Sequence, residues 1–139
     1  MGEISVDLAS QVDRLSTNAE KKRGLAFPRY FTKDLGPSQT PYGLLEWETR
    51  TASIANEKGE SIFEQREVEM PRDWSQTATN IVASKYFHGR VGTPEREHSL
   101  KQLVHRVVDT IADWGAADGY FATTEDVENF RDELAHLML

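Results

Sequence analysis

Side chains that can ligate a metal recur at helical spacing at His98, Gln102, His105 and Asp109. At about 100° per residue in an α-helix, these positions fall within roughly 60° of one another. They lie opposite the apolar stripe of the same segment, and a zinc site also needs supporting hydrogen bonds behind its ligands. We interpret the cluster as a solvated helix face and assign no metal ligand. His136 also lies opposite an apolar stripe and is expected at the surface.

Carboxylates alternate along two predicted strands, as Glu46 and Glu48 and as Glu64, Glu67 and Glu69. An acid–base pair needs two environments that push the pKa values of its members apart. Nothing in the sequence sets two of these carboxylates in contrasting environments. They are predicted to form the wet faces of the strands, and no catalytic residue is assigned.

The segment 88–97 combines two glycines with Arg90 and Arg96 just before a predicted helix. The N-terminus of a helix can bind an anion through its free N–H groups. Glu95 and Glu97 oppose an anion at this place, so a plain helix–helix connection is favoured.

Aromatic residues gather at predicted helix ends, at Tyr86, Phe87, Tyr120 and Phe121. Platforms that stack nucleic-acid bases lie in a positively charged groove. Without basic residues interleaved, these aromatics are interpreted as packing or interface residues.

The composition narrows the class of protein. The 139 residues carry a formal net charge of −7, which argues against nucleic-acid binding. The chain has no cysteine, which excludes a disulfide, a thiol nucleophile and a cysteine metal ligand. No apolar run approaches the roughly 18 residues of a membrane span, and no signal-peptide pattern is present. A cytoplasmic protein without a membrane partner is expected.

Two parts are expected along the chain. Residues 1–22 are polar, with a weak helical pattern at Val6, Leu8, Val12 and Leu15, and are expected to form a flexible tail. Residues 23–139 are expected to form a single domain. It begins with an extended strap over residues 23–32, because Pro28 argues against a continuous helix there, and a loop over 33–43 follows.

A β-hairpin is predicted at about residues 44–70. Its two β-rich runs are separated by a turn over residues 56–59, in which Gly59 supplies a positive φ. The alternation of polar and apolar residues is imperfect, so the sequence does not decide which face of the hairpin is buried.

Three amphipathic helices are predicted at about 74–87, 94–114 and 124–139. For the first, Asp73 is expected as the N-cap in a capping box with Gln76. The second is expected to begin at Thr93-Pro94 and to stop at Gly115. Its apolar stripe is Leu100, Leu103, Val104, Val107, Val108, Ile111 and Trp114. The stripe of the third is Val127, Phe130, Leu134, Leu137 and Met138.

The final stretch ELAHLML is apolar and carries no Gly, Asn or Pro stop signal. We expect its last carbonyls to be unpartnered and its last turn to fray in the isolated chain. A protein interface is predicted at Leu134, Leu137, Met138 and Leu139, where a neighbour would cover the end of the helix.

The fold class is therefore α+β and mainly α, with an N-terminal extended arm and a β-hairpin followed by three helices. Three short segments within that order are the most distinctive parts of the sequence: Trp74-Ser75-Gln76, residues 83–87 (ASKYF) and Trp114-Gly115. Over most of residues 22–139 the sequence resembles the N-terminal region of adenosylcobalamin-dependent (class II) ribonucleotide reductases.

The resemblance implies a large cytoplasmic enzyme that reduces ribonucleotides to deoxyribonucleotides for DNA synthesis. In that family adenosylcobalamin (vitamin B12) generates a thiyl radical on a cysteine inside an α/β barrel, and the region matched here is the non-catalytic domain that precedes the barrel. No family catalytic, cofactor-binding or metal-binding motif maps onto a residue of this chain.

The function expected from the resemblance is an N-terminal structural domain or split fragment, active only with its catalytic barrel, which is the implied partner in the same chain or as a separate subunit. The alternative is a small acidic protein-binding or regulatory module that uses the last helix as its interface.

Overall fold

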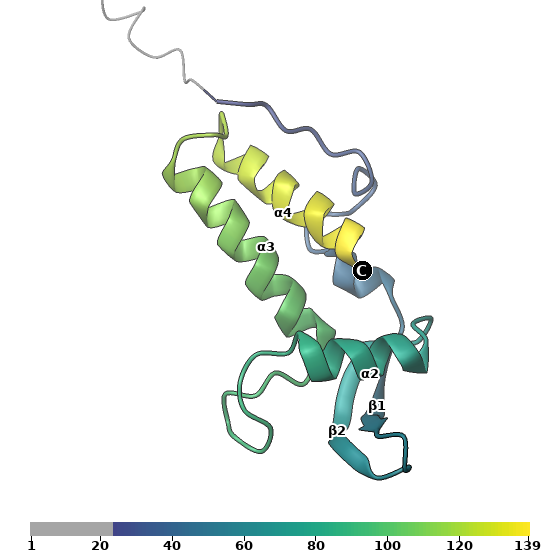
Figure 1. The fold of residues 1–139 in the computed structure, drawn as a ribbon. Helices are drawn as coiled ribbons and strands as arrows, with labels where there is room; N and C mark the ends of the chain where they lie inside the picture. Colours follow the sequence, from purple (N-terminus) through teal and green to yellow (C-terminus); the bar gives the residue numbers. More distant parts are fainter. Residues whose placement is uncertain (1–23) are drawn as a thin grey trace, which may run out of the picture.

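A twisted β-hairpin and an antiparallel helix pair form the two halves of the molecule in the computed structural model (Figure 1). The structure describes residues 24–139, so the expected flexible tail over 1–22 lies outside the described residues. The elements in chain order are the 3₁₀ turn η1 (Pro41–Leu44), the strands β1 (Trp47–Ala55) and β2 (Ser61–Pro71), and the helices α2 (Gln76–Lys85), α3 (Leu100–Ala117) and α4 (Thr124–Met138). The predicted hairpin and three helices are confirmed.

The hairpin turn follows the sequence prediction. Gly59 has φ of 80°, and the side-chain oxygen of Asn56 accepts hydrogen bonds from the backbone N–H groups of Lys58 and Glu60 at 3.0 and 2.9 Å. The strands pair antiparallel, with Trp47 opposite Pro71 at one end and Ala55 opposite Ser61 at the other.

A β-bulge explains the imperfect alternation of the second strand. Glu67 has φ of 55°, in the left-handed region, and the register shifts between Arg50 and Ala52 on the opposite strand. The extra residue moves the buried positions of β2 from Gln65 to Val68, an odd to an even number. The inner face of the hairpin therefore changes parity at the bulge.

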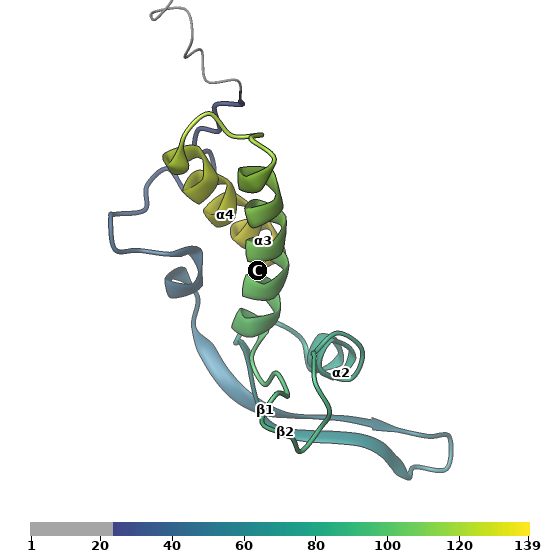
Figure 2. The ribbon, with the colours of Figure 1, turned by 90° about the vertical axis from the view of Figure 1, so that its left-hand side faces the viewer.

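Helix α2 lies across the inner face of the hairpin, which Figure 2 shows from the side. Its predicted cap at Asp73 is wrong, because Ser75 is the N-cap and accepts a hydrogen bond from the N–H of Ala78 at 3.1 Å. The N–H of Trp74 instead donates to the carbonyl of Pro71 at 3.1 Å. This turn between strand and helix delays the helix to Gln76.

The start of the next helix differs more. Residues 93–96 form a turn, and α3 begins only at Leu100, behind a capping box of Ser99 and Gln102. The chain before it is extended because the N–H of Glu97 donates to the carbonyl of His88 at 2.9 Å, and the carbonyl of His98 accepts from Glu69 at 2.7 Å. These long-range hydrogen bonds outweigh the local Thr-Pro start signal.

The end of α3 lies past the predicted stop. The helix continues through Gly115 to Ala117, and Gly119, with φ of 73°, follows as the left-handed residue. Gly115 is inside the helix for a packing reason: a Cβ there would lie 2.6 Å from the ring of Phe121.

Helix α4 packs antiparallel to α3 and begins after its N-cap Thr123, close to the prediction. The core joins the two halves of the molecule and consists of Ala52, Val68, Met70, Ala83, Phe87, Leu100, Val104, Val108 and Ala135. The predicted stripe of α3 is wrong at its far end, since Ile111 and Trp114 are 40% and 65% exposed. Ala112 and Gly115 are the buried residues there instead.

Among residues 24–139, no helix is both long and apolar enough to cross a membrane.

Candidate interaction site

Polar side chains of α4 clamp the extended strap along the helix. The side chains of Asp126, Asn129, Asp132 and Glu133 share one face of α4, and all of them bond to the strap. The expected extended strap is therefore present, and it lies on the last helix of the chain.

Two of these side chains hold the backbone of Phe27. Its N–H donates to Asp126 Oδ1 at 2.7 Å, and its carbonyl accepts from Asn129 Nδ2 at 2.9 Å. The ring of Phe27 then contacts that of Phe130 edge-on, with centroids 5.4 Å apart. Side chains of α4 therefore bind the polar backbone groups of Phe27, while its ring packs among other aromatic rings.

Glu133 forms the strongest part of the clamp. Its carboxylate, in a residue only 6% exposed, accepts hydrogen bonds from the N–H groups of Tyr30, Phe31 and Thr32 and from the Thr32 hydroxyl. Burial alone would raise the pKa of Glu133, but the four hydrogen bonds outweigh it and lower the pKa to about 2. The carboxylate is therefore ionised and holds the strap at neutral pH.

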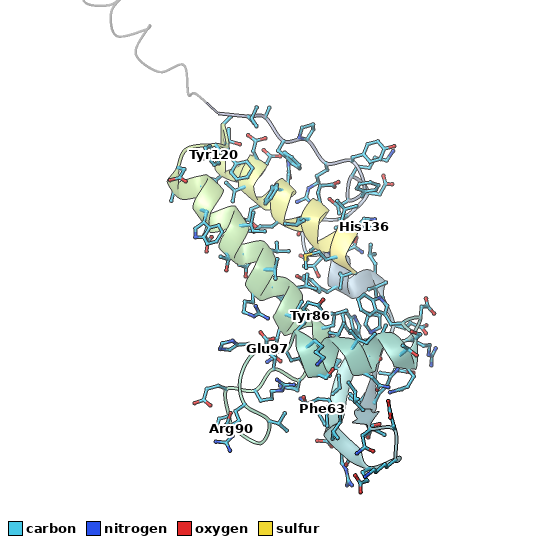
Figure 3. All side chains as sticks on the ribbon, viewed as in Figure 1. Phe63, Tyr86, Arg90, Glu97, Tyr120 and His136 are labelled. Atoms are coloured by element: carbon cyan, nitrogen blue, oxygen red, sulfur yellow. The ribbon has the colours of Figure 1, made fainter. Side chains whose placement is uncertain are left out.

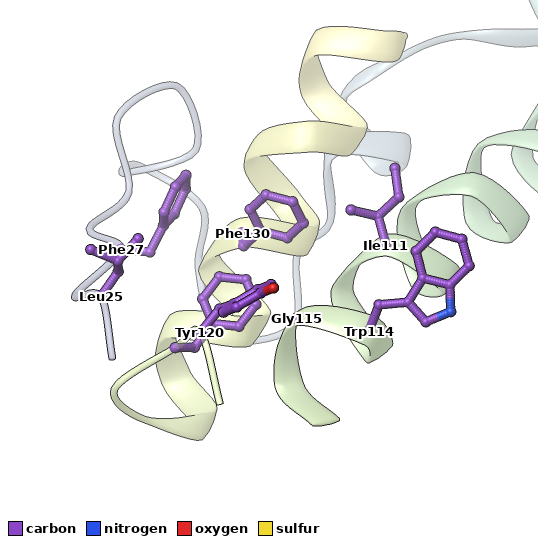
Figure 4. A pocket seen from close by; sticks show the side chains of 8 residues that line it. Leu25, Phe27, Ile111, Trp114, Gly115, Tyr120 and Phe130 are labelled. Atoms are coloured by element: carbon purple, nitrogen blue, oxygen red, sulfur yellow. The ribbon is translucent and has the colours of Figure 1, made fainter. Parts of the chain in front are cut away.

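An apolar pocket of about 340 Å³ opens between the strap and the ends of the two long helices (Figure 4). Its lining comes from the strap, α3, the α3–α4 loop and α4, and consists of Leu25, Phe27, Ile111, Trp114, Gly115, Tyr120, Phe121 and Phe130. Several of these side chains are open to solvent, with Leu25 69%, Trp114 65% and Tyr120 62% exposed. Neighbouring large apolar groups exposed together are typical of an interaction surface.

Phe121, which lines the pocket, is held by contacts on two sides. Its backbone is bridged to the strap, where the N–H of Leu25 donates to the carbonyl of Tyr120 at 2.7 Å and the N–H of Ala122 donates to the carbonyl of Leu25 at 2.9 Å. Its ring packs on Gly115. Sequence reasoning placed Tyr120 and Phe121 among packing or interface residues but missed the pocket, because the strap that forms one wall is about 90 residues away in the chain.

The predicted interface on the last helix lies at the other end of the molecule. Leu134, Met138 and Leu139 pack partly buried against the core, while Leu137 is 64% exposed. The expectation of unpartnered last carbonyls is wrong for Leu139, whose carbonyl accepts a hydrogen bond from Trp74 Nε1 at 2.8 Å. The interface itself stays a prediction, with Leu137 as the side chain free to meet a neighbour.

The polar face of α3 is partly covered rather than solvated throughout. The ring of His105 stacks on Tyr42 at 4.4 Å, and Asp109 accepts from Arg131 of α4 at 2.6 Å. Burial, followed by the charges of Asp109 and Asp132, raises the pKa of Tyr42 to about 12.

The histidine–carboxylate cluster is divided among structural contacts. The side chain of Gln102 belongs to the capping box of α3. Among residues 24–139, no three His, Cys, Asp or Glu side chains converge as metal ligands. His136 is exposed (Figure 3), and its ring stacks on that of Phe31 in the strap, with the centroids 5.0 Å apart.

Several of the strand carboxylates form ion pairs. Arg72 pairs with Glu46 and also lies 3.8 Å from Glu48, which accepts from Arg50 Nε at 2.7 Å. Glu64 pairs with Arg66 at 3.1 Å.

Glu69, the last of the three carboxylates on the second strand, is only partly exposed. The hydroxyl of Ser99 donates to Glu69 at 2.5 Å and lowers its pKa, with Lys101 3.2 Å away as a further cause. Glu69 therefore ties β2 to the start of α3.

The segment 88–97 is internally bonded through Arg96 and Glu97. The guanidinium of Arg96 donates to the carbonyls of Ala83, Phe87 and Gly89, of which that of Ala83 lies in the last turn of α2. Arg90 projects from the loop and is exposed (Figure 3). The segment 88–97 is thus a connection between helices, as the sequence favoured, and Arg96 fastens it to the preceding helix α2.

Glu97 is also used structurally. It is 9% exposed and accepts from the His88 N–H at 2.8 Å and from Arg106 Nε at 2.7 Å. Burial would raise the pKa of Glu97, but these hydrogen bonds, led by that from Arg106, lower it. No signal in the sequence distinguished Glu97 from the exposed Glu95.

Comparison with known proteins places the chain beside one enzyme family. The family model of class II vitamin B12-dependent ribonucleotide reductase matches residues 48–139. Proteins named vitamin B12-dependent ribonucleotide reductase are similar to the chain at 50% identity in Rhodopirellula baltica and at 47% in Streptomyces coelicolor, over 85% and 84% of this chain. The relative in Agrobacterium fabrum is 28% identical over 79% of the chain. The chain spans 11% to 12% of the length of these relatives.

Proposed function

This chain belongs to the class II vitamin B12-dependent ribonucleotide reductase family, as its sequence predicted, and we propose that it is the non-catalytic N-terminal structural domain of such an enzyme. Residues 23–139 would act as one domain that braces a catalytic barrel, either in the same polypeptide or as a separate subunit. The whole enzyme would convert ribonucleotides to deoxyribonucleotides in the cytoplasm.

The use of the charged residues supports a structural role. The carboxylates whose pKa values are lowered by hydrogen bonds, Glu69, Glu97, Asp126 and Glu133, each join one element to another. Perturbed carboxylates often mark active sites, but structural ion-pair networks perturb them as well. Here each shift is accounted for by a contact that holds the fold.

The residues of the apolar pocket do not fit adenosylcobalamin. The corrin ring of cobalamin carries peripheral amides that need hydrogen-bond partners, and the pocket is lined by leucine, isoleucine, glycine and aromatic residues. We propose that the cofactor belongs to the barrel, and we derive no step of the reaction through residues of this chain.

The face that meets the barrel is proposed to include the last turn of α4. Leu137 is 64% exposed there, beside the partly buried Leu134, Met138 and Leu139. Burying a leucine of this exposure in an interface removes apolar surface from water and favours association.

An activity comparison in the full-length reductase tests this role. Leu137→Asp should place a charge in the interface and lower the rate of deoxyribonucleotide formation at least tenfold. Leu137→Met, which keeps an apolar side chain at this position, should retain the rate of the native enzyme. Ile62→Asp is the matched control, because Ile62 on the hairpin is 66% exposed and lies away from α4. Equal activity of Leu137→Asp and Ile62→Asp would contradict the proposed face.

The alternative, a small acidic regulatory module, predicts a different outcome. Affinity capture with the chain would then recover a protein other than a reductase barrel through the same last helix, and addition of the chain would leave reductase activity unchanged.

A further inference from the structure

Two exposed aromatic residues, Tyr30 and Phe31, form a ridge at the end of the strap, and we call them the strap ridge. They are 73% and 50% exposed, and their rings contact edge to face with centroids 4.9 Å apart. The ring of Phe31 also stacks on that of His136, which Figure 3 labels near the end of α4. Neighbouring large apolar groups exposed together are typical of a surface that meets another protein.

The strap ridge is continuous with the last turn of α4, which we propose to meet the catalytic barrel. Leu137 lies one helical turn beyond Glu133, and Glu133 accepts hydrogen bonds from the N–H groups of Tyr30 and Phe31 at 3.1 and 2.9 Å. Leu137 is 64% exposed and directly follows His136 in the chain. The ridge and Leu137 therefore lie on the same side of α4, where one partner surface can contact both.

The clamp on the strap fixes the shape of the ridge in advance. The N–H groups of three successive residues, 30–32, donate to the carboxylate of Glu133, a residue that is only 6% exposed. The backbone of the strap is thus held on the helix while the two rings stay exposed. A surface already ordered in its binding conformation loses less conformational entropy on association. Glu133 is therefore a positioning residue for the strap ridge.

The charges beside the ridge indicate which kind of surface it fits. Arg29, the residue before the ridge, pairs with Asp132 at 2.5 Å. The ridge itself presents two aromatic rings and one phenolic hydroxyl, and neither side chain carries a charge. A charged partner surface would lose its hydration here without gaining an ion pair. The matching surface is largely apolar, with a hydrogen-bond acceptor for the hydroxyl of Tyr30.

We propose that the strap ridge docks on the catalytic barrel of the full-length reductase together with Leu137. This inference rests on the proposed function of the chain, and it adds the strap to an interface that otherwise belongs to α4 alone. The relatives are long enough to supply such a surface, because this chain spans only 11% to 12% of their length. Release of the strap from Glu133 would remove the ridge from the interface even when Leu137 is unchanged.

Cysteine labelling in the full-length reductase tests this docking, with the labelled position identified by mass spectrometry. Tyr30→Cys and Leu137→Cys should each react with a maleimide at least tenfold more slowly in the native enzyme than in urea. Tyr86→Cys is the matched control, because Tyr86 at the end of α2 is 62% exposed, and it should react at nearly its rate in urea. Reaction of Tyr30→Cys as fast as that of Tyr86→Cys would overturn the proposal.

The labelling also separates this inference from the proposed function on which it rests. Protection of Leu137→Cys without Tyr30→Cys would overturn the role of the ridge and leave the proposed function standing. Labelling of both positions at the rate of the control would contradict both proposals. Protection of Tyr30→Cys alone would overturn the shared interface. Protection of Tyr30→Cys that rises with enzyme concentration would place a second copy of the protein on the ridge and would also overturn the proposal.

Enzyme activity gives a second readout. Replacing both ridge residues, Tyr30→Ser with Phe31→Ser, removes the rings but keeps the backbone N–H groups that donate to Glu133, so the strap should stay in place. The rate of deoxyribonucleotide formation by the full-length enzyme should fall at least tenfold in this double variant and stay within about twofold in Tyr86→Ser. Circular dichroism checks that both variants retain their helices. Equal rates in the two folded variants would overturn the proposal.

Discussion

The carboxylate of Glu133 accepts hydrogen bonds from both the backbone N–H and the hydroxyl of Thr32, at 2.8 and 2.5 Å, across 101 residues of sequence. Thr32 is 1% exposed, so this contact is buried and fixes the end of the strap on α4. One side chain thereby connects the first described segment with the last helix.

Replacing Glu133 should destabilise the protein. Glu133→Ala leaves the buried N–H and hydroxyl of Thr32 without their partner, for an expected loss of about 3 kcal/mol in the free energy of unfolding. Asp132→Ala is the neighbouring control, because its pair with Arg29 is partly solvated, and it should cost less than about 1 kcal/mol. Urea denaturation measures both. Equal losses would show that the strap is not held mainly by Glu133.

The same contact predicts a pH dependence of stability. The pKa of Glu133 is about 2 in the folded protein and 4.5 in an ordinary environment. A carboxyl with a lowered folded-state pKa contributes stability above its unfolded pKa, and this contribution is lost as pH falls from about 4.5 to about 2. Urea denaturation of the native chain and of Glu133→Gln at pH 6, 4 and 3 tests it. The native chain should lose more stability than Glu133→Gln over this range, and parallel losses would contradict the assignment.

The predictable part of the fold rests on local signals. Gly59 marked the hairpin turn, and Pro28 marked the strap, because each restricts the backbone whatever surrounds it. The bulge at Glu67 and the late start of α3 at Leu100 depend on pairing between distant segments. Local propensity carries no information on that pairing.

The candidate site, like the fold, could be predicted only where local sequence signals determine it. Trp114 and Ile111 match the period of the buried stripe of α3, yet they stay exposed, because burial depends on which neighbour covers that turn of the helix. Periodicity alone identifies an apolar face and not its partner.

Close packing at Gly115 provides a prediction on this pocket. Gly115→Ala should destabilise the protein by about 1–3 kcal/mol, because the new methyl group would lie 2.6 Å from the Phe121 ring. Helix propensity alone favours alanine by about 1 kcal/mol. In the Phe121→Ala background the ring is absent, so Gly115→Ala should become neutral or stabilising. Thermal unfolding of Gly115→Ala against its parent, in the native and in the Phe121→Ala background, measures whether the effect on stability changes sign. A loss of stability that persists without the Phe121 ring would contradict the packing argument.

Cobalamin should not bind the isolated 139-residue chain. The pocket lining offers few polar partners for the amides of the corrin ring. An absorbance titration with adenosylcobalamin should show no saturable change at micromolar concentrations. A saturable change in the native chain that is lost in Trp114→Asp would place a cofactor site in the pocket and contradict the proposed division of roles.

The last prediction concerns Arg96, the residue that fastens the 88–97 loop. Its guanidinium donates to the backbone carbonyls of Phe87 and Gly89 at 2.8 and 2.9 Å and to Gln65 Oε1 at 2.9 Å. Burial lowers the pKa of Arg96, with the charge of Glu97 opposing that effect, so the group is held by its hydrogen bonds in a partly desolvated place.

Removing this side chain leaves several acceptors unpaired at once. Arg96→Ala should therefore reduce the free energy of unfolding by about 2–4 kcal/mol, and Arg96→Lys should recover only part of it, because an ammonium group cannot reproduce the planar fork. Arg90→Ala, in the same loop but exposed, should change stability by less than about 0.5 kcal/mol. Denaturant unfolding decides the comparison. Full recovery by lysine would show that charge alone, without the geometry of the guanidinium, holds the loop against α2.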